Sequence, residues 1–329
     1  MSIAQAPNSL QTDAFRKDVL EGLTATPKRL PSRWLYDGEG SRLFEEITTL
    51  DEYYLSRCES AILHENASEL AAFAGADAIL IEYGAGAGIK SQALLTALNA
   101  PAAYVPVDIA DEFLSCTLER FGGRFPELPI CPVVADFTSD FDLPPLPSSG
   151  RRIAFFAGST IGNLDEGEAV ELLMRMRIHV GEGGRALIGM DLIKDLGTLA
   201  KAYDDRGGVT AAFNLNVLRR INREIGGGIP LDAFVHEARW NPAERAIEMH
   251  LRCVYSFSTS VGGQVVRFIV GETIHTETSR KYDLPRIDRL VELAGWTRRG
   301  TWNDEKCAFA VVGLEASQGG ESSALAAST

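Results

Sequence analysis

Residues 76–98, ADAILIEYGAGAGIKSQALLTAL, decide the fold of this chain. An apolar run typical of a buried strand leads into the turn GAGAG, and apolar residues at helical spacing follow it. A second strand and helix are predicted in 103–121, and further strands in 129–137, 151–164 and 183–193. Strands that are apolar along their whole length and alternate with helices indicate a parallel sheet covered on both faces.

The pattern changes after about Lys194. Two helical segments are followed by three long strands with antiparallel turn signals, predicted at 231–241, 245–259 and 263–279. A helix at 284–296 and an apolar strand at 306–316 then resume the first pattern, and the N-terminal part predicts helices at 12–24, 40–49 and 57–73. We therefore expect an α/β protein with a Rossmann-like sheet and a second, α+β domain.

The expected boundaries follow from these changes of pattern. The domain of the parallel sheet is predicted to comprise 59–193 and 281–316, the second domain 11–58 and 194–280, and the flexible termini 1–10 and 317–329. Two prolines in PKRLPS, residues 27–32, predict a break after the first helix.

Composition limits the possible partners. Thirty-two basic and 45 acidic residues give a net charge of −13, which argues against nucleic acid or an anionic membrane surface as the main partner. The five cysteines are scattered without a C-x-x-C pair, so we expect neither a disulfide framework nor a zinc site. The chain has no secretory signal pattern and no long apolar run, so we expect a monomeric protein of the cytoplasm.

The glycine turn distinguishes between cofactor classes. A dinucleotide fingerprint would need glycine at position 89, which is Ile89, and the spacing of Lys90-Ser91 does not fit a P-loop. A site for S-adenosylmethionine (SAM) remains, with Gly84 and Gly86 approaching its methionine part. Acids close the next two strands. Asp108 would accept the ribose hydroxyls, and Asp136-Phe137 would lie at the adenine.

Several stretches together resemble a known family, the histidine-specific, SAM-dependent methyltransferases of ergothioneine biosynthesis. The resemblance is carried by SRWLYDGEGSRLFEEITTLDEYYLSR, IEYGAGAGIKS, VADF, FFAGSTIGNL, MDLIKD, AYDDRGGVTAAFNLNVLRRINRE and HTETSRKY, and covers about residues 12–315. It implies SAM-dependent trimethylation of the α-amino group of L-histidine to hercynine, with SAM as co-substrate, no metal, and a free amino acid as the only partner.

The resemblance also implies site residues at matching positions. For the cofactor these are Gly84, Gly86, Lys90, Asp108, Asp136 and Phe137. For the amino acid they are Tyr53, Asn163, Tyr203, Met249, Glu277, Thr278 and Ser279, with Tyr36, Tyr53 and Asn163 closest to the chemistry. The turn GAGAG departs from the family, which more often has serines there, so contacts with the cofactor carboxylate are expected to differ in detail.

These residue types suit the implied reaction. The Asn163 amide can donate to a carboxylate and accept from an amine, the Tyr53 and Tyr203 hydroxyls can donate to the carboxylate, and a Tyr36 face can attract a growing ammonium. Glu277 and Ser279 can serve the two imidazole nitrogens, and Met249 can form an apolar wall.

Each residue alone also fits a plainer role in a turn, on a solvated strand face or in the core. Two other functions stay open on the sequence: methylation of another amino acid, such as a tryptophan derivative, and a non-catalytic SAM-binding module.

Overall fold

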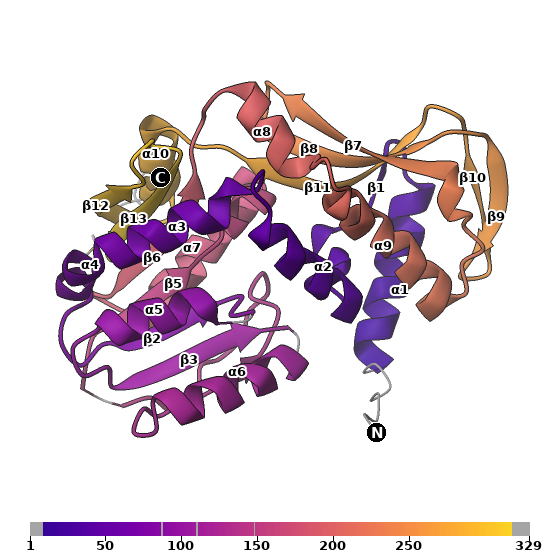
Figure 1. Ribbon diagram of the computed structural model, residues 1–329. Helices are drawn as coiled ribbons and strands as arrows, with labels where there is room; N and C mark the ends of the chain where they lie inside the picture. Colours follow the sequence, from indigo (N-terminus) through magenta and orange to yellow (C-terminus); the bar gives the residue numbers. More distant parts are fainter. Residues whose placement is uncertain (1–8, 87, 110, 148, 318–329) are drawn as a thin grey trace, which may run out of the picture. The chain divides into compact units, whose positions relative to one another are not determined.

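The computed structural model describes residues 9–86, 88–109, 111–147 and 149–317. Its contacts divide the chain into two compact units, shown in Figure 1. Unit 1 comprises Met1–Tyr54 and Lys194–Arg280, and unit 2 comprises Leu55–Ile193 and Lys281–Thr329. Each unit is therefore built from two separated stretches of sequence, and the chain passes from one unit to the other three times.

Unit 2 contains a seven-stranded sheet in the order β12-β13-β6-β5-β2-β3-β4. Its strands are β2 (Ile79–Tyr83), β3 (Ala103–Asp108), β4 (Val133–Val134), β5 (Arg152–Phe156), β6 (Arg185–Asp191), β12 (Trp296–Asn303) and β13 (Phe309–Ala316). The first five are parallel to one another, and β13 pairs antiparallel with both β6 and β12. The predicted α/β fold with a Rossmann-like sheet is confirmed.

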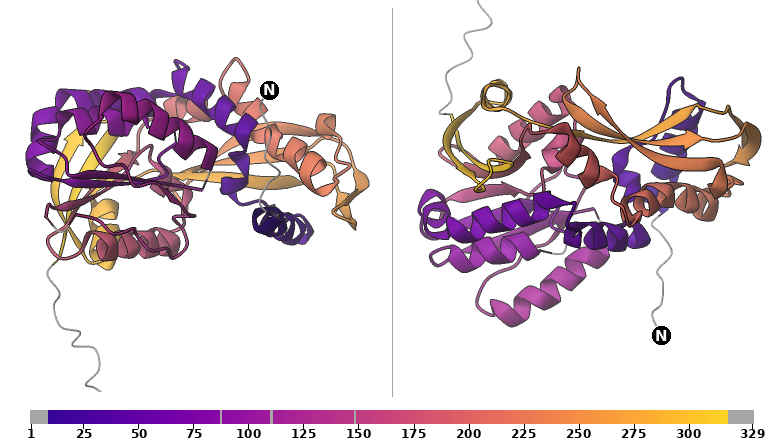
Figure 2. Two further views of the ribbon diagram at one scale, coloured as in Figure 1. Left: turned by 90° about the horizontal axis from the view of Figure 1, so that it is seen from below. Right: turned by 45° about the horizontal axis from the view of Figure 1, so that its top comes forward.

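Helices cover both faces of this sheet, as Figure 2 shows. The helical elements of unit 2 are α3 (Tyr54–Glu65), α4 (Ala67–Ala74), α5 (Ile89–Ala97), α6 (Asp111–Arg124), η2 (Thr160–Asn163), α7 (Glu166–Val180) and α10 (Leu284–Leu293). Helices α7 and α10 pack on one face, and α4 and α5 lie together on the other. A sheet buried on both sides explains why its strands are apolar at consecutive positions.

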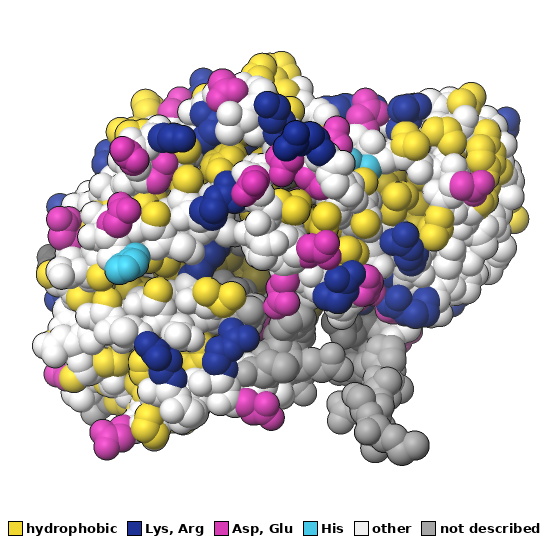
Figure 3. Space-filling model, viewed as in Figure 1, with side chains coloured by type: hydrophobic (Ala, Val, Ile, Leu, Met, Phe, Trp, Pro, Cys, Tyr) yellow, Lys and Arg dark blue, Asp and Glu magenta, His cyan; other side chains and the backbone are white. Residues whose placement is uncertain are grey.

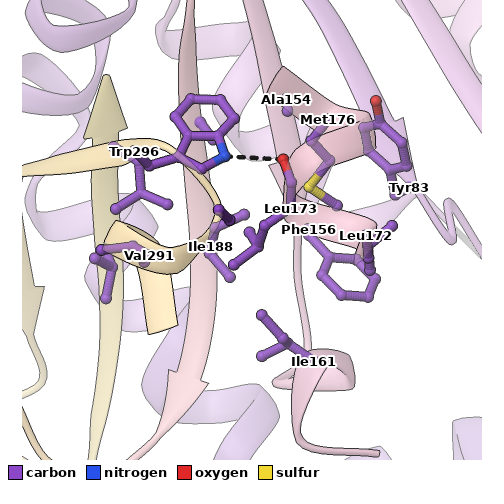
Figure 4. Packing of buried hydrophobic residues seen from close by; sticks show 14 of the residues in the cluster. Tyr83, Ala154, Phe156, Ile161, Leu172, Leu173, Met176, Ile188, Val291 and Trp296 are labelled. Carbon is purple, nitrogen blue, oxygen red and sulfur yellow. Dashed lines mark hydrogen bonds between the residues drawn. The ribbon is translucent and has the colours of Figure 1, made fainter. Parts of the chain in front are cut away.

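Apolar side chains of α7, α10 and the sheet form the main core of unit 2 (Figure 4). Leu173 and Met176 of α7 and Val291 of α10 are all at most 1% exposed. Trp296, at the start of β12, is buried with them, and its indole N–H donates to the Leu173 carbonyl at 2.8 Å. This bond satisfies the one polar atom of the side chain in an otherwise apolar environment.

Unit 1 combines helices with an antiparallel sheet. Its helical elements are α1 (Ser9–Thr24), η1 (Ser32–Leu35), α2 (Gly38–Thr49), α8 (Leu196–Tyr203), α9 (Val209–Ile225) and η3 (Leu231–Ala233). Its strands are β1 (Lys28–Arg29), β7 (Phe234–Asn241), β8 (Ala246–Cys253), β9 (Phe257–Val261), β10 (Gln264–Phe268) and β11 (Thr273–Arg280). The order β1-β11-β8-β7 makes one sheet, and β9 and β10 form a separate hairpin.

The structure corrects several predicted elements. The helix expected at 57–73 is two helices, α3 and α4, which meet at Asn66. The strand expected at 245–259 is divided into β8 and β9, and the strand expected at 263–279 is divided into β10 and β11. The division arises because β9 and β10 pair only with each other. The strand expected at 129–137 is reduced to the two residues of β4.

Other differences occur at element ends. The break predicted at PKRLPS contains the short strand β1, which pairs parallel with β11. The helix expected at 284–296 ends at Leu293, and β12 follows it without having been predicted. Ser9 and Leu10 belong to α1, so the prediction of a flexible N-terminus at 1–10 is wrong for these two residues. Residues 1–8 and 318–329 of the expected flexible termini lie outside the described residues.

Charged side chains of both signs are interspersed over the face of each unit shown in Figure 3. Among the helices that the structure describes, none combines the length and the apolar character needed to cross a membrane.

The orientation of α7 predicts very different losses of stability for two neighbouring substitutions. Leu173 is fully buried, whereas 43% of Met174 is exposed. Leu173→Ala should lower the free energy of unfolding by about 2–5 kcal/mol, because it leaves a cavity in the core. Met174→Ala, the matched control, should change it by less than about 0.5 kcal/mol. Urea unfolding of both variants measures this, and equal effects would contradict the packing of α7.

Candidate active site

The turn between β2 and α5 has a backbone that requires glycine. Gly84, Gly86 and Gly88 all have positive φ, of 68°, 48° and 67°. Side chains disfavour this region, whereas glycine enters it freely. The amides of Gly84 and Ala85 donate to the Val107 carbonyl at 2.8 and 3.1 Å, which ties the turn to the end of β3. The first part of the turn, Gly84 and Ala85, is therefore fixed at the carboxyl ends of β2 and β3.

Asp108 and Phe137 lie against this turn. The Asp108 carboxylate, at the end of β3, accepts the Gly86 amide at 2.9 Å. A Cβ atom on Gly84 would lie 3.3 Å from the Phe137 ring, so the ring rests on the bare glycine. Phe137 also packs edge-on against Phe156 at the end of β5, with ring centroids 5.3 Å apart. The structure thus brings together the cofactor residues predicted at three strand ends.

Asp136 shapes the loop that carries Phe137. Its carboxylate accepts the Thr138 amide at 2.9 Å and the Thr138 hydroxyl at 2.5 Å, which closes a tight turn after β4. The Phe137 carbonyl accepts from Arg175 of α7 at 3.1 Å. The loop is therefore held from both sides of the phenylalanine.

Lys90 follows β2 and Asn163 follows β5, the two neighbouring strands at which the order of the sheet reverses. From β2 the chain adds β3 and β4 on one side, and it then adds β5 and β6 on the other side. Lys90 is in the first turn of α5, and its ammonium contacts the carboxylate of Glu59 at 2.5 Å. Asn163 ends η2, the short helix after β5. Ligands of open α/β sheets bind at such a switch point.

The turn that leads to Asn163 is anchored at several points. Ser159 is left-handed, with φ of 58°, a conformation that non-glycine residues adopt only when their surroundings impose it. Its hydroxyl accepts the Asp191 amide at 2.8 Å, and the Tyr282 hydroxyl donates to the Ile161 carbonyl at 3.3 Å. Held in this way, the turn gives Asn163 a defined position.

Glu82 is buried beneath the glycine turn. Its carboxylate accepts the hydroxyl of Tyr104, which also lies 3.2 Å from the Ser91 hydroxyl. Burial raises the pKa of Glu82 to about 7. Hydrogen bonds from Ser91 and Tyr104 lower this pKa, but the effect of burial is larger. The carboxyl thus titrates near neutral pH, in contact with Tyr104 of β3 and Ser91 of α5.

Unit 1 contains a cluster of aromatic side chains. Tyr36 packs edge-on against Phe44 and Phe213, with centroids 5.4 and 5.3 Å apart, and Tyr53 packs against Tyr203 at 6.2 Å. Burial raises the pKa of Tyr36 well above its usual value, and the charge of Glu277 and the neighbouring tyrosines add to this. The Tyr36 hydroxyl therefore stays protonated and can donate.

Polar groups of β11 meet this cluster. The Tyr203 hydroxyl lies 2.6 Å from the Ser279 hydroxyl, and Glu277 stands opposite Met249 in the pairing of β11 with β8. Glu277, Ser279 and Met249 are 8%, 4% and 2% exposed. Unit 1 therefore brings together, in a largely buried environment, residues from both of its chain segments that were predicted to bind the amino-acid substrate.

Thr278 is the exception among the predicted residues of unit 1. Successive residues of a strand point to opposite faces, so the Thr278 side chain faces away from Glu277 and Ser279. Its hydroxyl pairs with the His275 ring at 2.9 Å. Only its backbone can belong to the same site.

A second layer supports Tyr203. The His236 ring contacts the Tyr203 carbonyl through Nε2 at 2.8 Å and the Asn214 amide through Nδ1 at 2.9 Å. The Asn214 amide also donates to the His250 carbonyl at 3.1 Å. A neutral ring that donates through Nε2 and accepts through Nδ1 satisfies both contacts.

Sequence reasoning missed this layer, and it also missed Glu59. A signal for Glu59 exists, because it shares a helical face with the buried Leu55 and Ile62. No comparable pattern marks Asn214 and His236, which meet only through the fold. Within the described residues no three His, Cys, Asp or Glu side chains are grouped to hold a metal ion.

Comparisons with known proteins agree in one family. The family model described as histidine-specific methyltransferase, SAM-dependent, matches residues 15–316. A histidine N-alpha-methyltransferase of Mycolicibacterium smegmatis is 40% identical over 297 residues, covering 89% of this chain and 92% of that protein. One from Mycobacterium tuberculosis is 41% identical with the same coverage. Ergothioneine biosynthesis protein 1 of Neurospora crassa is 31% identical, over 84% of this chain and 32% of that protein.

Glu82 predicts a dependence of stability on pH. A carboxyl whose pKa is raised by folding from 4.5 to about 7 stabilises the fold fully below pH 4.5 and loses that contribution as the pH rises through 7. Relative to wild type, Glu82→Gln should therefore gain up to about 3 kcal/mol in free energy of unfolding between pH 4.5 and 8. Denaturant unfolding across this range measures the difference, and a constant difference would show that Glu82 ionises normally.

Proposed function

Because this chain belongs to the family of histidine-specific, SAM-dependent methyltransferases, we propose that it transfers methyl groups from SAM to the α-amino group of free L-histidine. The product of three transfers is hercynine, the trimethyl betaine of histidine, and the pathway is that of ergothioneine. The observation that supports this most is the buried set of Tyr203, Ser279 and Glu277 in unit 1.

The polar groups of unit 2 fit the cofactor. The Asp108 carboxylate can accept from a vicinal diol such as the ribose hydroxyls, because a carboxylate has two oxygens and about four acceptor positions. Beside it, the Phe137 ring, which packs against Gly84, offers an aromatic surface on which a flat adenine can stack. Lys90 supplies a cation at the N-terminal turn of α5, which suits a carboxylate.

The polar groups of unit 1 fit the amino acid. An imidazole needs one polar partner at each nitrogen, and Glu277 and Ser279 point to the same face of β11 and offer an acceptor and a hydroxyl. The Tyr36, Tyr53 and Tyr203 hydroxyls can donate to the amino-acid carboxylate. We also propose that Asn163 binds the amino-acid head, because its amide can both donate and accept.

The main task of the protein in this reaction is to position the α-amine and the methyl group of SAM. SAM supplies an electrophilic methyl group on a positive sulfur. The α-amine must be neutral to attack, and a neighbouring positive charge lowers its pKa. Aromatic faces such as that of Tyr36 tolerate the quaternary ammonium of the product. Orientation of the amine toward the methyl carbon, within about 3 Å, can supply much of the rate enhancement.

A cytoplasmic location and a monomeric state remain predictions. Free thiols at Cys131, Cys253 and Cys307 support a reducing compartment.

Mass spectrometry tests the function directly. The purified chain is incubated with SAM and each of the twenty amino acids. We expect histidine alone to gain mass, in steps of one, two and three methyl groups, with one S-adenosylhomocysteine formed per methyl. Synthetic monomethyl- and dimethylhistidine should also be converted. Absence of methylated histidine, or equal methylation of other amino acids, would reject the proposal.

Glu277 should determine specificity for the ring. Glu277→Ala leaves an imidazole N–H without its acceptor in a largely dry environment, at a cost of about 1–3 kcal/mol. This corresponds to roughly a ten- to hundredfold loss in histidine affinity. The change also removes a buried charge that disfavours apolar rings, so relative activity on tryptophan and phenylalanine should rise, and rise further when Met249 is made smaller.

The measurement is kcat/KM for the three amino acids. Glu248→Ala is the matched control, because it removes the same charge from the opposite face of the sheet, at the residue paired with Thr278. The control should keep the histidine-to-tryptophan ratio of wild type. A ratio within about threefold of wild type in Glu277→Ala would mean that Glu277 does not contact the ring.

A further inference from the structure

Glu59 is a buried acid of unit 2 that the proposed reaction has not used. It lies on α3, and its side chain is fully buried. The Lys90 ammonium, 21% exposed, contacts it at 2.5 Å. Burial of a carboxylate is costly unless a charge partner and further hydrogen bonds compensate for it. The position is therefore one at which the fold holds a charge despite this cost.

Backbone groups complete the surroundings of this carboxylate. The Gly158 amide lies 3.0 and 2.8 Å from its two oxygens. A Cβ on Gly189 of β6 would lie 2.1 Å from the Glu59 carboxylate, so only glycine leaves room for it there. A Cβ on Gly158 would lie 3.5 Å from the Lys90 ammonium, which places this ammonium over the start of the turn after β5. Glu59 is thus held rigidly, and it holds the lysine in turn.

We propose that Glu59 is a positioning residue, which fixes the Lys90 ammonium so that it binds the carboxylate at the methionine end of the cofactor. This inference rests on the proposed function. Among the polar groups of SAM only that carboxylate is an anion, and Lys90 provides a partly exposed cation beside the glycine turn. Glu59 itself is fully buried and acts only through the lysine.

The physical benefit is entropic. A lysine side chain has four rotatable bonds, and ordering it on binding costs conformational entropy. Pairing with a fixed carboxylate orders the ammonium before the cofactor arrives, and the remaining N–H groups of the ammonium stay available to the ligand. The opposite electrostatic effect, repulsion between Glu59 and the incoming carboxylate, predicts tighter binding when Glu59 is neutralised. The two ideas therefore differ in sign.

The experiment compares two ligands that differ only at the methionine end. S-Adenosylhomocysteine carries the amino and carboxylate groups, whereas 5′-methylthioadenosine has the same nucleoside and thioether without them. Glu59→Gln keeps an acceptor for the Gly158 amide and removes the charge. We expect it to bind S-adenosylhomocysteine at least tenfold more weakly than wild type, by calorimetry, with the affinity for 5′-methylthioadenosine changed by less than twofold.

Two further variants sharpen the result. Glu59→Asp keeps the charge but shortens its reach, so the same selective loss is expected, and it provides the test if Glu59→Gln does not fold. Glu65→Gln makes the same chemical change at an exposed position of α3 and should leave both affinities as in wild type. Equal weakening of both ligands, no change, or tighter binding of S-adenosylhomocysteine would overturn the proposal. Failure of wild type to bind S-adenosylhomocysteine would instead reject the proposed function.

Discussion

The parallel pairing of β2 with β3 and β5 is the constraint on which the architecture of unit 2 depends. The carboxyl ends of parallel strands lie at one common edge of the sheet, so residues that follow different strands lie close together although they are far apart in sequence. Gly84, Asp108 and Phe137 meet there because each follows the end of a different strand. The flanking helices then only have to bury the sheet, and the loops at this edge are left to bind ligands.

Buried charges mark the places where that edge must be rigid. Lys281 and Asp191 are both fully buried and lie 2.7 Å apart, where the chain leaves β6 and where it returns to unit 2. The Asp191 amide is bound by Ser159 in the turn before Asn163. An ion pair of this kind adds little net stability but strongly disfavours any arrangement that separates its partners. It therefore helps to keep the turn after β5 in one conformation.

Sequence patterns predicted the central strands β2, β3, β5 and β6 well, because these buried strands are apolar along most of their length and the signal is local. They predicted β12 and β1 poorly. β12 is a polar edge strand, TRRGTWN after Trp296, and β1 is two residues long and exists only because β11 lies beside it. Similarly, the glycine turn and the acids at the strand ends could be found from their spacing in the sequence. The residues predicted to bind the amino-acid substrate could be found only through family resemblance. His236 and Asn214 support Tyr203 from other elements, so no local pattern marks them.

The division of each unit between two separated stretches of chain has a consequence for biosynthesis. A ribosome releases the chain from its N-terminus, yet unit 1 lacks β7, β8 and β11 until Arg280 has emerged, and the sheet of unit 2 lacks β13 until Ala316 has emerged. An N-terminal fragment shorter than residues 1–280 therefore contains neither unit complete. Until synthesis is nearly finished, β6 presents an unpaired apolar edge to the cell, the kind of surface that chaperones shield from aggregation.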